Sequence, residues 1–520
     1  MRKWLLALAV MVLGLGSAAP VRGGTLVYGR YADSLFLDPV FTDANLDIWI
    51  MQNLYETLIQ IGPGGKGLVP GLATNWGFSK DGKTFTLALR PGVKFSDGTP
   101  LTAEDVKFSL ERAKNPDNGA WNFLLSSVNT VAVKGNQIVL SLKNPDPSLP
   151  AALATFNSAI LPKKLYVAAK GKDEKERAKN FAEKPVGTGP FMLKEWKRGS
   201  SMTLVRNPLY WRKGADGKPL PYLDAVRFEI IPDDSARILK LQSGELDGAE
   251  FIPFARVAEL QADPKLSMKL FPSTRVNFIV MNTRPKLKNG ADNPLSNLKL
   301  CQALNYATDK QALIRLVSFG NGKPMTSYLS SSTPLQAPQP MYPYNLDKAK
   351  QLFSASGFGL GLELTLQIVA GSADQSALAT ALQQMWEGIG VKLKIEQQDS
   401  ATQNARYAEG DFQMQFNYWT DDIADPNELT AYATVYKNNQ SFQTGFQSDE
   451  VDRLFAASQQ ETNPAKRAAQ YKRIQEIYVN AAPMVFLYEQ PFAVALSKRV
   501  RDFVQIPLGN NVFVNTYLEK

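Results

Sequence analysis

The sequence contains no histidine and only one cysteine, Cys301, among its 520 residues. Without histidine, the chain cannot build a Ser-His-Asp triad, a Cys-His dyad or a site with imidazole metal ligands. A single cysteine excludes a disulfide framework, a zinc site of several cysteines and an iron–sulfur cluster within one chain. Most familiar hydrolase and metalloenzyme chemistry is therefore excluded, and we expect no metal and no cofactor.

The chain also lacks any concentration of positive charge. Its formal net charge is +9, but the basic residues are scattered and no dense Lys/Arg tract occurs. Because nucleic-acid-binding domains gather basic residues on one face, nucleic acid is not an expected partner. With 44% hydrophobic and 21% charged residues, the composition is that of a globular protein. At about 100–200 residues per domain, we expect two to four domains.

The first residues have the pattern of a secretory signal peptide. Arg2 and Lys3 precede an apolar run over residues 4–15, and small residues follow up to Ala19. The run is shorter than the roughly 20 apolar residues of a membrane anchor. We expect cleavage after Ala19 or Gly23, which makes residues 1–23 the signal peptide. No cysteine lies near this boundary for lipid attachment, so we expect a soluble periplasmic protein.

Hydrophobic periodicity predicts a mixed α/β chain with more than one lobe. Helical spacing of apolar residues indicates long helices over residues 45–59, 299–317 and 375–390. Strands are predicted over 364–369 and 391–396, on either side of the last of these helices. Such a strand–helix–strand unit is typical of parallel sheets that are covered by helices.

Residues 76–112 carry the most specific pattern, WGFSKDGKTFTLALRPGVKFSDGTPLTAEDVKFSLER. It combines two Asp-Gly turns with a helix start at Thr102, where Asp105 stands in the capping-box position. This segment closely resembles the signature region of the extracellular solute-binding proteins of ABC importers, in the peptide- and nickel-binding family. Further stretches that resemble the family follow in the expected order, at residues 37–39, 186–191, 206–211, 244–247, 302–309, 344–357 and 450–483.

The resemblance covers essentially the whole mature chain and implies the fold and the function. The implied fold is α/β, of the type II periplasmic-binding-protein kind, with two lobes, a hinge and an extra subdomain in the first lobe. Lobe I would comprise residues 24–58, 186–275 and 490–520, with the subdomain at 59–185 and lobe II at 276–489. The implied function is that of a soluble, monomeric receptor that binds an extended ligand, such as a short peptide, and delivers it to an ABC permease in the inner membrane.

A strand predicted over residues 412–419 leads to the strongest candidate site. Its side chains alternate between two faces, with Phe412, Met414, Phe416 and Tyr418 on one and Gln413, Gln415, Asn417 and Trp419 on the other. The second face is unusually polar, which suggests that it lines a wet cleft. Acidic residues follow at the end of the strand, where open α/β sheets bind ligands.

Among these acids, Asp422 matches the family's aspartate that holds the α-ammonium of a peptide, and Trp419 matches the tryptophan before it. A carboxylate in a closing cleft would form a charge-assisted bond with an ammonium group. The alternative is that Asp421, Asp422 and Asp425 are ordinary turn acids. We expect Asp425 to cap the helix that begins near Pro426.

Two segments match the family's ligand-flanking strands, to which an extended peptide can add as a further strand. Their residues are Ala32, Asp33, Ser34 and Leu35 in one segment and Asn417, Tyr418 and Trp419 in the other. Trp121, Phe123, Glu250 and Phe251 are candidates for lining the pockets, although aromatic residues more often belong to a core.

Departures from the family pattern narrow the ligand. Dipeptide-binding relatives use an arginine ahead of the helix predicted at 375–390 to hold the carboxylate of the ligand, but residues 368–374 contain no arginine. Longer peptides, or a cationic or neutral ligand, are therefore favoured over a zwitterionic dipeptide. Without histidine, nickel delivery is disfavoured too. Asn297 and Cys301 stand where the family usually has Asp and Arg, and we expect Cys301 to be a small buried thiol.

Two rival functions remain open at this point. The first is a receptor of the same fold for an oligosaccharide or another non-peptide solute, which aromatic and neutral polar side chains would suit. The second is an enzyme, such as a glycosidase using Asp421 or Asp422, which would need a second carboxylate about 5–10 Å away. We favour a binding protein without catalysis.

Overall fold

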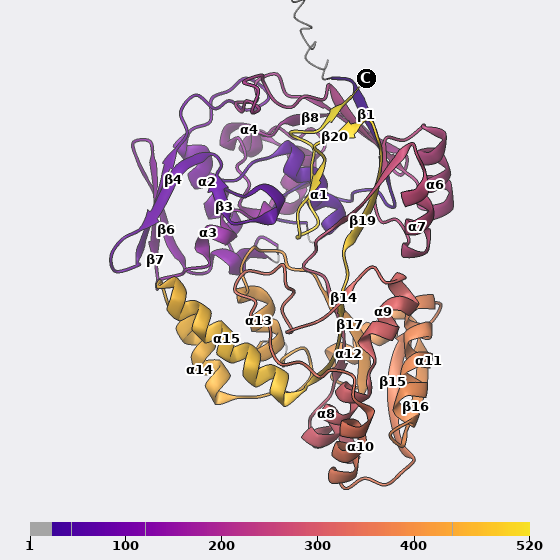
Figure 1. Cartoon of the computed structure of the whole chain (residues 1–520). Coiled ribbons are helices and arrows are strands. Elements are labelled where there is room, and N and C mark those ends of the chain that lie inside the picture. Colours follow the sequence, from indigo (N-terminus) through magenta and orange to yellow (C-terminus); the bar gives the residue numbers. More distant parts are fainter. Residues whose placement is uncertain (1–22, 43, 120, 439, 520) are drawn as a thin grey trace, which may run out of the picture.

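The computed structural model describes residues 23–42, 44–119, 121–438 and 440–519, and the predicted signal peptide up to residue 22 lies outside these ranges. The chain forms two lobes, one above the other in Figure 1, each built around its own sheet. We call the part built on the seven-stranded sheet lobe I and the part built on the six-stranded sheet lobe II. A four-stranded sheet forms a subdomain beside lobe I.

The sheet of lobe I is mixed. β1 pairs in parallel with β10 and β11, and the other pairs are antiparallel. In sheet order the strands are β12 (Leu266–Phe271), β19 (Phe492–Ser497), β11 (Gly248–Ala249), β1 (Thr25–Arg30), β10 (Ala225–Ile230), β9 (Ser201–Arg206) and β8 (Phe191–Lys197). The helices of this lobe are α1 (Asn45–Leu54), α6 (Asp234–Ser243) and α7 (Phe254–Ala262). The C-terminal segment adds two short antiparallel pairs, β20 (Val500–Arg501) with β23 (Tyr517–Leu518) and β21 (Val504–Gln505) with β22 (Asn511–Val512).

The subdomain combines an antiparallel sheet with short helices. Its strands, in sheet order, are β4 (Ala73–Phe78), β5 (Thr84–Leu89), β7 (Gln137–Leu142) and β6 (Val128–Lys134), and β2 (Ile59–Ile61) pairs with β3 (Leu68–Pro70) nearby. Its helices are α2 (Ala103–Lys114), α3 (Leu149–Ala152), α4 (Lys163–Ala168) and α5 (Glu174–Ala182). The predicted capping box is confirmed, since Thr102 and Asp105 exchange both side-chain-to-backbone bonds at the start of α2.

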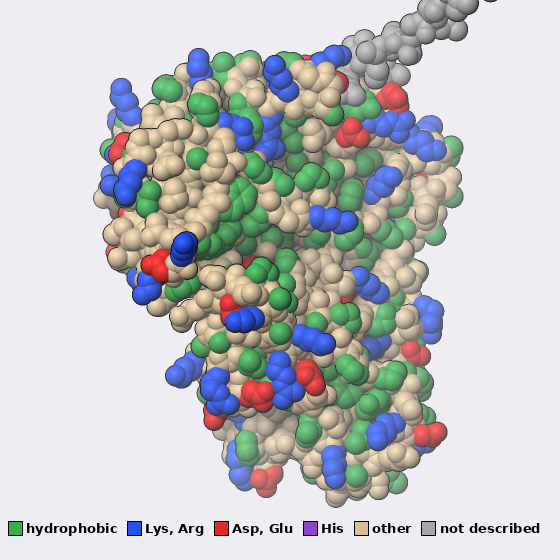
Figure 2. All heavy atoms as spheres, turned by 60° about the vertical axis from the view of Figure 1, so that its left-hand side comes forward, with side chains coloured by type: hydrophobic (Ala, Val, Ile, Leu, Met, Phe, Trp, Pro, Cys, Tyr) green, Lys and Arg blue, Asp and Glu red, His purple; other side chains and the backbone are tan. Residues whose placement is uncertain are grey.

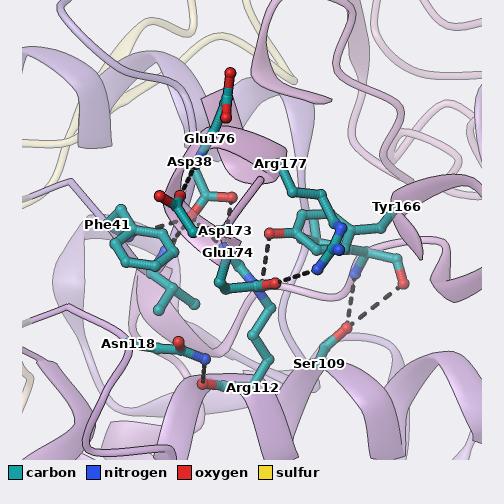
Figure 3. A network of polar contacts seen from close by, with 12 residues as sticks. Asp38, Phe41, Ser109, Arg112, Asn118, Tyr166, Asp173, Glu174, Glu176 and Arg177 are labelled. Atoms are coloured by element: carbon teal, nitrogen blue, oxygen red, sulfur yellow. Dashed lines mark hydrogen bonds and ion pairs between the residues drawn. The ribbon is translucent and has the colours of Figure 1, made fainter. Parts of the chain in front are cut away.

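A buried polar network joins this subdomain to lobe I (Figure 3). Arg112 of α2 donates from one nitrogen to both carboxylate oxygens of Asp38, at 2.9 and 3.0 Å, and from Nε to Glu174 of α5 at 2.7 Å. Tyr166 of α4 also donates to Glu174, and its ring lies 4.5 Å from the guanidinium carbon. Asp38 lies in the loop after β1, so the network fixes that loop against three helices of the subdomain.

Lobe II contains the predicted strand–helix–strand unit, which is confirmed. β15 (Leu362–Val369) and β16 (Val391–Gln398) pair in parallel, and α11 (Ala373–Glu387) connects them. The full sheet order is β14 (Lys323–Pro324), β18 (Met484–Glu489), β13 (Val276–Met281), β17 (Met414–Trp419), β15 and β16. The other helices are α8 (Leu298–Ala307), α9 (Lys310–Ser318), α10 (Leu346–Ala355), α12 (Ser400–Ala408), α13 (Asn427–Thr434), α14 (Asp449–Ser458) and α15 (Pro464–Ala481).

Two predicted helices have different bounds. The helix expected over 45–59 ends at Leu54, and Ile59 belongs to β2. The carbonyl of Leu54 accepts from the N–H of Gly189, and a Cβ at Gly189 would lie 2.5 Å from the Leu54 carbonyl carbon. This close approach of another chain segment ends the helix, which the periodicity of residues 45–59 could not show.

The helix expected over 299–317 is two helices, α8 and α9. Asp309 separates them, because its carboxylate accepts from the N–H of Ala312 and thereby caps α9. The prediction that Cys301 is a buried thiol is confirmed. Its side chain is 1% exposed in α8, and its Sγ donates to the carbonyl of Leu295 at 3.1 Å.

The chain passes between the two large sheets at two places, between β12 and β13 and between β18 and β19. The two connections lie side by side, since the N–H of Gln490 donates to the carbonyl of Arg275 and Ser273 Oγ donates to the carbonyl of Gln490. The predicted lobe boundaries stay a prediction, which this distribution of strands supports.

None of the helices within the described segments combines the length and the apolar character needed to cross a bilayer. On the face shown in Figure 2, basic and acidic side chains are interspersed, and hydrophobic side chains gather around a hollow near its middle.

Candidate functional site

The lobes touch each other next to the strongest predicted site. Ile423 of lobe II is 1% exposed and belongs to the hydrophobic cluster of the subdomain. Asn427 of α13 donates from its amide to Ser148 Oγ of the subdomain at 3.1 Å. The acidic segment after β17 therefore lies at the junction between the lobes.

The prediction that the polar face of β17 lines a wet cleft is wrong. Gln413 accepts from the backbone N–H of Thr365 at 2.7 Å, and Gln415 is 3% exposed and donates to the carbonyl of Gln403 at 3.4 Å. Gln403 belongs to α12, so this helix covers the polar face at Gln415. An alternating sequence pattern cannot distinguish a polar face that is covered by a helix from one that faces solvent.

The last residues of β17 have different surroundings. Tyr418 is 56% exposed, with the guanidinium of Arg275 4.1 Å from its ring centre. Trp419 packs in lobe II against Tyr432 and Phe442, with ring centres 5.1 and 5.5 Å apart. Asn417 accepts from the N–H of Tyr418 through its own amide oxygen. Tyr418 is therefore the side chain of this segment that is open to a ligand.

Asp421 is a buried acid held by two threonines. It is 2% exposed, and one carboxylate oxygen accepts from Thr333 Oγ1 at 2.5 Å while the other has no partner among the described residues. Its backbone N–H donates to Thr274 Oγ1 at 2.9 Å. Burial raises the pKa of Asp421 to about 8, against which the bond from Thr333 acts in the opposite direction.

Asp422 forms a carboxyl pair with Glu428, which lies in the first turn of α13. The Asp422 N–H donates to Glu428 Oε2 at 3.2 Å, and the two carboxyl groups are also hydrogen-bonded to each other. Burial raises the pKa of Asp422 to about 6. Burial, followed by the charges of Asp422 and Asp421, raises the pKa of Glu428 well above its usual range. Asp422 therefore ionises at a lower pH than Glu428, which keeps its proton longer.

Asp425 has a structural role, as predicted. Its carboxylate accepts from the N–H of Asn427, the first residue of α13, at 2.9 Å. The same carboxylate forms a bidentate ion pair with Arg467 of α15, at 2.7 and 2.8 Å. Within the described residues, neither Asp421, Asp422 nor Glu428 forms such a pair with a Lys or Arg. The site thus has excess negative charge and no cation of its own.

A cavity of only about 10 Å³ lies directly beside Asp422, and two larger cavities lie close to the acidic pair. A small cavity next to Asp422 is lined from lobe I by Asn45, Ile48, Gln52, Phe156 and Asn510, among others. Gln52, Ile61, Ala154 and Phe156 also line a cavity of about 430 Å³ between lobe I and the subdomain, most of whose walls are apolar. A third cavity, of about 530 Å³, lies between the subdomain and lobe II and reaches Glu428. The acidic pair therefore lies among three hollows.

The other predicted ligand-flanking segment, residues 32–35, forms no strand. The Asp33 carboxylate accepts from Trp196 Nε1 and from the N–H of Gly199, and Ser34 is 2% exposed and donates to the carbonyl of Leu46. Ala32 is half-buried, whereas Leu35 is 69% exposed. The side chains of Asp33 and Ser34 are thus bound within lobe I, and Leu35 is the one open to solvent.

The predicted pocket residues mostly belong to the packing of lobe I. Glu250 is 1% exposed and forms a buried ion pair with Arg30 at 3.3 Å. Trp121 donates from Nε1 to the carbonyl of Thr42 and packs edge-on against Phe156. Because Phe156 lines the cavity beside Asp422, Trp121 lies one layer behind it.

Phe251 and Phe123 lie closer to open space. Phe251 has a positive φ of 52° and packs against Trp49 and, edge-on, against Tyr31. Phe123 is 39% exposed and lines the cavity between the subdomain and lobe II. The ligand roles proposed for Trp121, Glu250 and Phe251 stay predictions.

Sequence reasoning missed Glu428 and Arg275. Glu428 is six residues beyond Asp422, and no periodic pattern relates a loop residue to the first turn of the next helix. Arg275 directly precedes the apolar strand β13, which is the one signal that could have drawn attention to it. Among the described residues, no group of three or more His, Cys, Asp or Glu side chains is arranged to hold a metal ion.

Comparison with known proteins agrees with this two-lobe architecture. The family described as bacterial extracellular solute-binding proteins, family 5, matches residues 67–442. The chain belongs to this family of solute-binding proteins.

Relatives match over nearly the whole chain. A probable D,D-dipeptide-binding periplasmic protein of Escherichia coli is 29% identical over 99% of this chain and 98% of its own. The structure of HbpA2 from Haemophilus parasuis has a TM-score of 0.82 at 28% identity, covering 95% of this chain and 100% of that one. The periplasmic binding protein DppA from Helicobacter pylori, in complex with the peptide STSA, has a TM-score of 0.77 at 26% identity, covering 96% and 99%. The fold is therefore the bilobal type II fold of periplasmic binding proteins.

Proposed function

We propose that this chain is the periplasmic substrate-binding receptor of an ABC importer and that it closes its two lobes around a short peptide. The observation that carries the proposal is the uncompensated acidic pair, Asp422 and Glu428, at the junction of the lobes. Family membership supports the receptor role, and the relative solved with a bound peptide supports the class of ligand.

The chemistry of the pair suits an ammonium group. An ionised Asp422 would accept a charge-assisted hydrogen bond from the amino terminus of the ligand. The protonated carboxyl of Glu428 would donate to Asp422 and keep its oxygens oriented. Because Asp422 is largely desolvated and has no Lys or Arg partner, a cation placed here should gain more than at an exposed carboxylate.

The cavity between lobe I and the subdomain is consistent with an extended ligand. It shares lining residues with the small cavity beside Asp422, and its walls are mostly apolar. A ligand whose amino group contacts Asp422 could therefore place an apolar side chain in this space of about 430 Å³.

Closure would use the two adjacent connections between the sheets as a hinge, and the ligand would shift the equilibrium towards the closed form. As part of the proposal, residues 1–23 are a cleaved signal peptide, 24–58, 186–275 and 490–520 form lobe I, 59–185 the subdomain and 276–489 lobe II. The mature receptor is a monomer without a lipid anchor, carries out no chemical step and docks on an inner-membrane permease.

Native mass spectrometry of the purified mature protein tests the proposal. The protein is sprayed intact, then denatured, and any released molecules are identified. Released short peptides would support the peptide receptor. Release of a defined sugar or of another non-peptide metabolite would contradict it while leaving the receptor class intact. If nothing is released, titration with a set of synthetic tripeptides decides, because a peptide receptor must retain members of the set.

A further inference from the structure

Arg275 is a half-buried cation without an acidic partner. It lies in the connection between the sheets, one residue before β13, and among the described residues its side chain forms no hydrogen bond or ion pair. Its Nε is inaccessible to solvent and unpaired, and its guanidinium lies over the ring of Tyr418 at 4.1 Å. A guanidinium stays charged in proteins, so burying it without a counter-charge is costly.

The groups around Arg275 do not neutralise it. Four titratable groups lie close enough to affect Arg275 electrostatically: Tyr418, Tyr488, Tyr31 and Asp374. Asp374 is the only acid among them, and it stands exposed in the first turn of α11 without forming an ion pair with Arg275. The three tyrosines offer rings and hydroxyl groups but no negative charge at neutral pH.

Arg275 also lies where both lobes meet the candidate ligand. Tyr31 follows directly after β1 of lobe I, Tyr418 lies in β17 of lobe II, and Arg275 lies in the connection between the two sheets. Tyr31 and Tyr418 are both close enough to affect Arg275 electrostatically. Leu35, the exposed residue of the predicted ligand-flanking segment, is four residues beyond Tyr31. The guanidinium therefore lies near side chains of both lobes.

The position of Arg275 relative to Asp422 is fixed by the sheet. Val276 pairs with Trp419 in the antiparallel ladder of β13 and β17, and the N–H of Asp421 donates to Thr274 Oγ1. Arg275 precedes β13 and Asp422 follows β17, so both residues lie at the same end of these two neighbouring strands. Arg275 presents a cation without an acidic partner, and Asp422 presents an acid without a Lys or Arg partner.

We propose that Arg275 is an anion subsite that binds a carboxylate of the ligand, so that the receptor selects zwitterionic peptides. This inference rests on the proposed function and specifies its ligand. A carboxylate matches the planar donor fork of a guanidinium and would supply the missing counter-charge. Arg275 would then provide the contact for which residues 368–374 contain no arginine.

Competition between two forms of the same peptides tests the subsite. A set of synthetic tripeptides with free amino termini is made once as free acids and once as C-terminal amides, and equal amounts are offered to the full mature protein after ligand removal. Retained peptides are quantified by mass spectrometry. We expect the wild type to prefer the acids by about tenfold or more, which corresponds to at least about 1.4 kcal/mol.

Variants of Arg275 test whether this residue causes the preference for peptide acids over amides. Arg275→Met should abolish the preference for acids and leave the binding of amides within about twofold, whereas Arg275→Lys should retain part of it because the charge remains. Arg315→Met, at an exposed arginine of α9, is the matched control and should retain the full preference. If Arg275→Met does not fold, the wild type and Arg275→Lys still give the answer.

The outcomes separate the two proposals. Equal retention of acids and amides by the wild type, or an unchanged preference in Arg275→Met, would overturn the anion subsite and leave the peptide receptor standing. Retention of neither form by the wild type would overturn the peptide receptor and the subsite with it. A preference for acids that is lost in Arg275→Met supports both.

Discussion

Asp422 and Glu428 form a carboxyl pair at the junction of the two lobes. The backbone N–H of Asp422 donates to Glu428 Oε2 at 3.2 Å, and the carboxyl groups bond to each other. Burial raises the pKa of both, and Asp422 is the one that ionises first, with a pKa of about 6. An acidic pair without a cation adds no net stability of its own, which is the physical reason for connecting it with a cationic ligand group.

Asp422→Asn should weaken the binding of peptides with a free amino terminus by about 2–5 kcal/mol, because the charge-assisted bond to the ammonium group is lost. Isothermal titration calorimetry with a tripeptide that the wild type binds measures the change. The N-acetylated form of the same peptide is the control and should bind the wild type and the variant about equally. Equal affinity of both proteins for the free amine would contradict the assignment.

Glu428→Gln is the matched variant for the second member of the pair. The amide can still donate to Asp422, as the protonated carboxyl does, so most of the affinity for the free amine should remain. Glu428→Ala removes that donor and should weaken binding. A loss in Glu428→Gln as large as that in Asp422→Asn would mean that Glu428 carries the negative charge instead.

Affinity should depend on pH through the same pair. Asp422 must be ionised to bind an ammonium group, and its pKa is about 6. Calorimetry between pH 5 and pH 7.5 should therefore show tighter binding as the pH rises, with most of the gain around pH 6. Asp422→Asn should show little dependence over this range. Affinity that is flat for the wild type would argue against Asp422 as the titrating group.

Asp421 should make the ligand-free protein less stable at higher pH. Its pKa is about 8 in the folded protein, above the value near 4 of an unfolded chain. The folded state thus binds more protons between these values, and stability falls as the pH rises through the range. Asp421→Asn should flatten this part of the profile and melt at a higher temperature than the wild type at pH 8. Melts at pH 5 and pH 8 that change equally in both proteins would contradict it.

Arg112→Met should destabilise the protein by about 3–5 kcal/mol, since it leaves Asp38 buried without its partner. Thermal or urea unfolding measures the loss. The control is Arg473→Met. Arg473 lies on α15 and forms an exposed ion pair with Glu450 of α14, so its loss should change stability little. A small loss of stability in Arg112→Met would show that the polar network does not fix the helices of the subdomain to lobe I.

Cys301 should be unreactive in the native protein. The thiol is 1% exposed, and burial raises its pKa to about 12, so the reactive thiolate is scarce. Ellman's reagent should give no colour with the folded protein and one equivalent in guanidinium chloride. Rapid reaction under native conditions would mean that the region of α8 opens locally.

Several local features followed from the sequence because short-range chemistry decides them. The capping box at Thr102 and the parallel unit of β15, α11 and β16 depend on nearby residues and on hydrophobic periodicity. The family pattern at residues 76–112 likewise indicated the two-lobe fold.

The site depended on contacts that no local pattern contains. α12 covers Gln415 on the polar face of β17, Glu428 meets Asp422 across a turn, and Arg275 lies beside the end of β17 through a ladder between distant strands. The sequence determined which charged groups exist and which elements carry them. Only the tertiary structure decided which of these groups were paired on burial and which were left without a counter-charge, because pairing depends on distance in space and desolvation on what the rest of the chain covers.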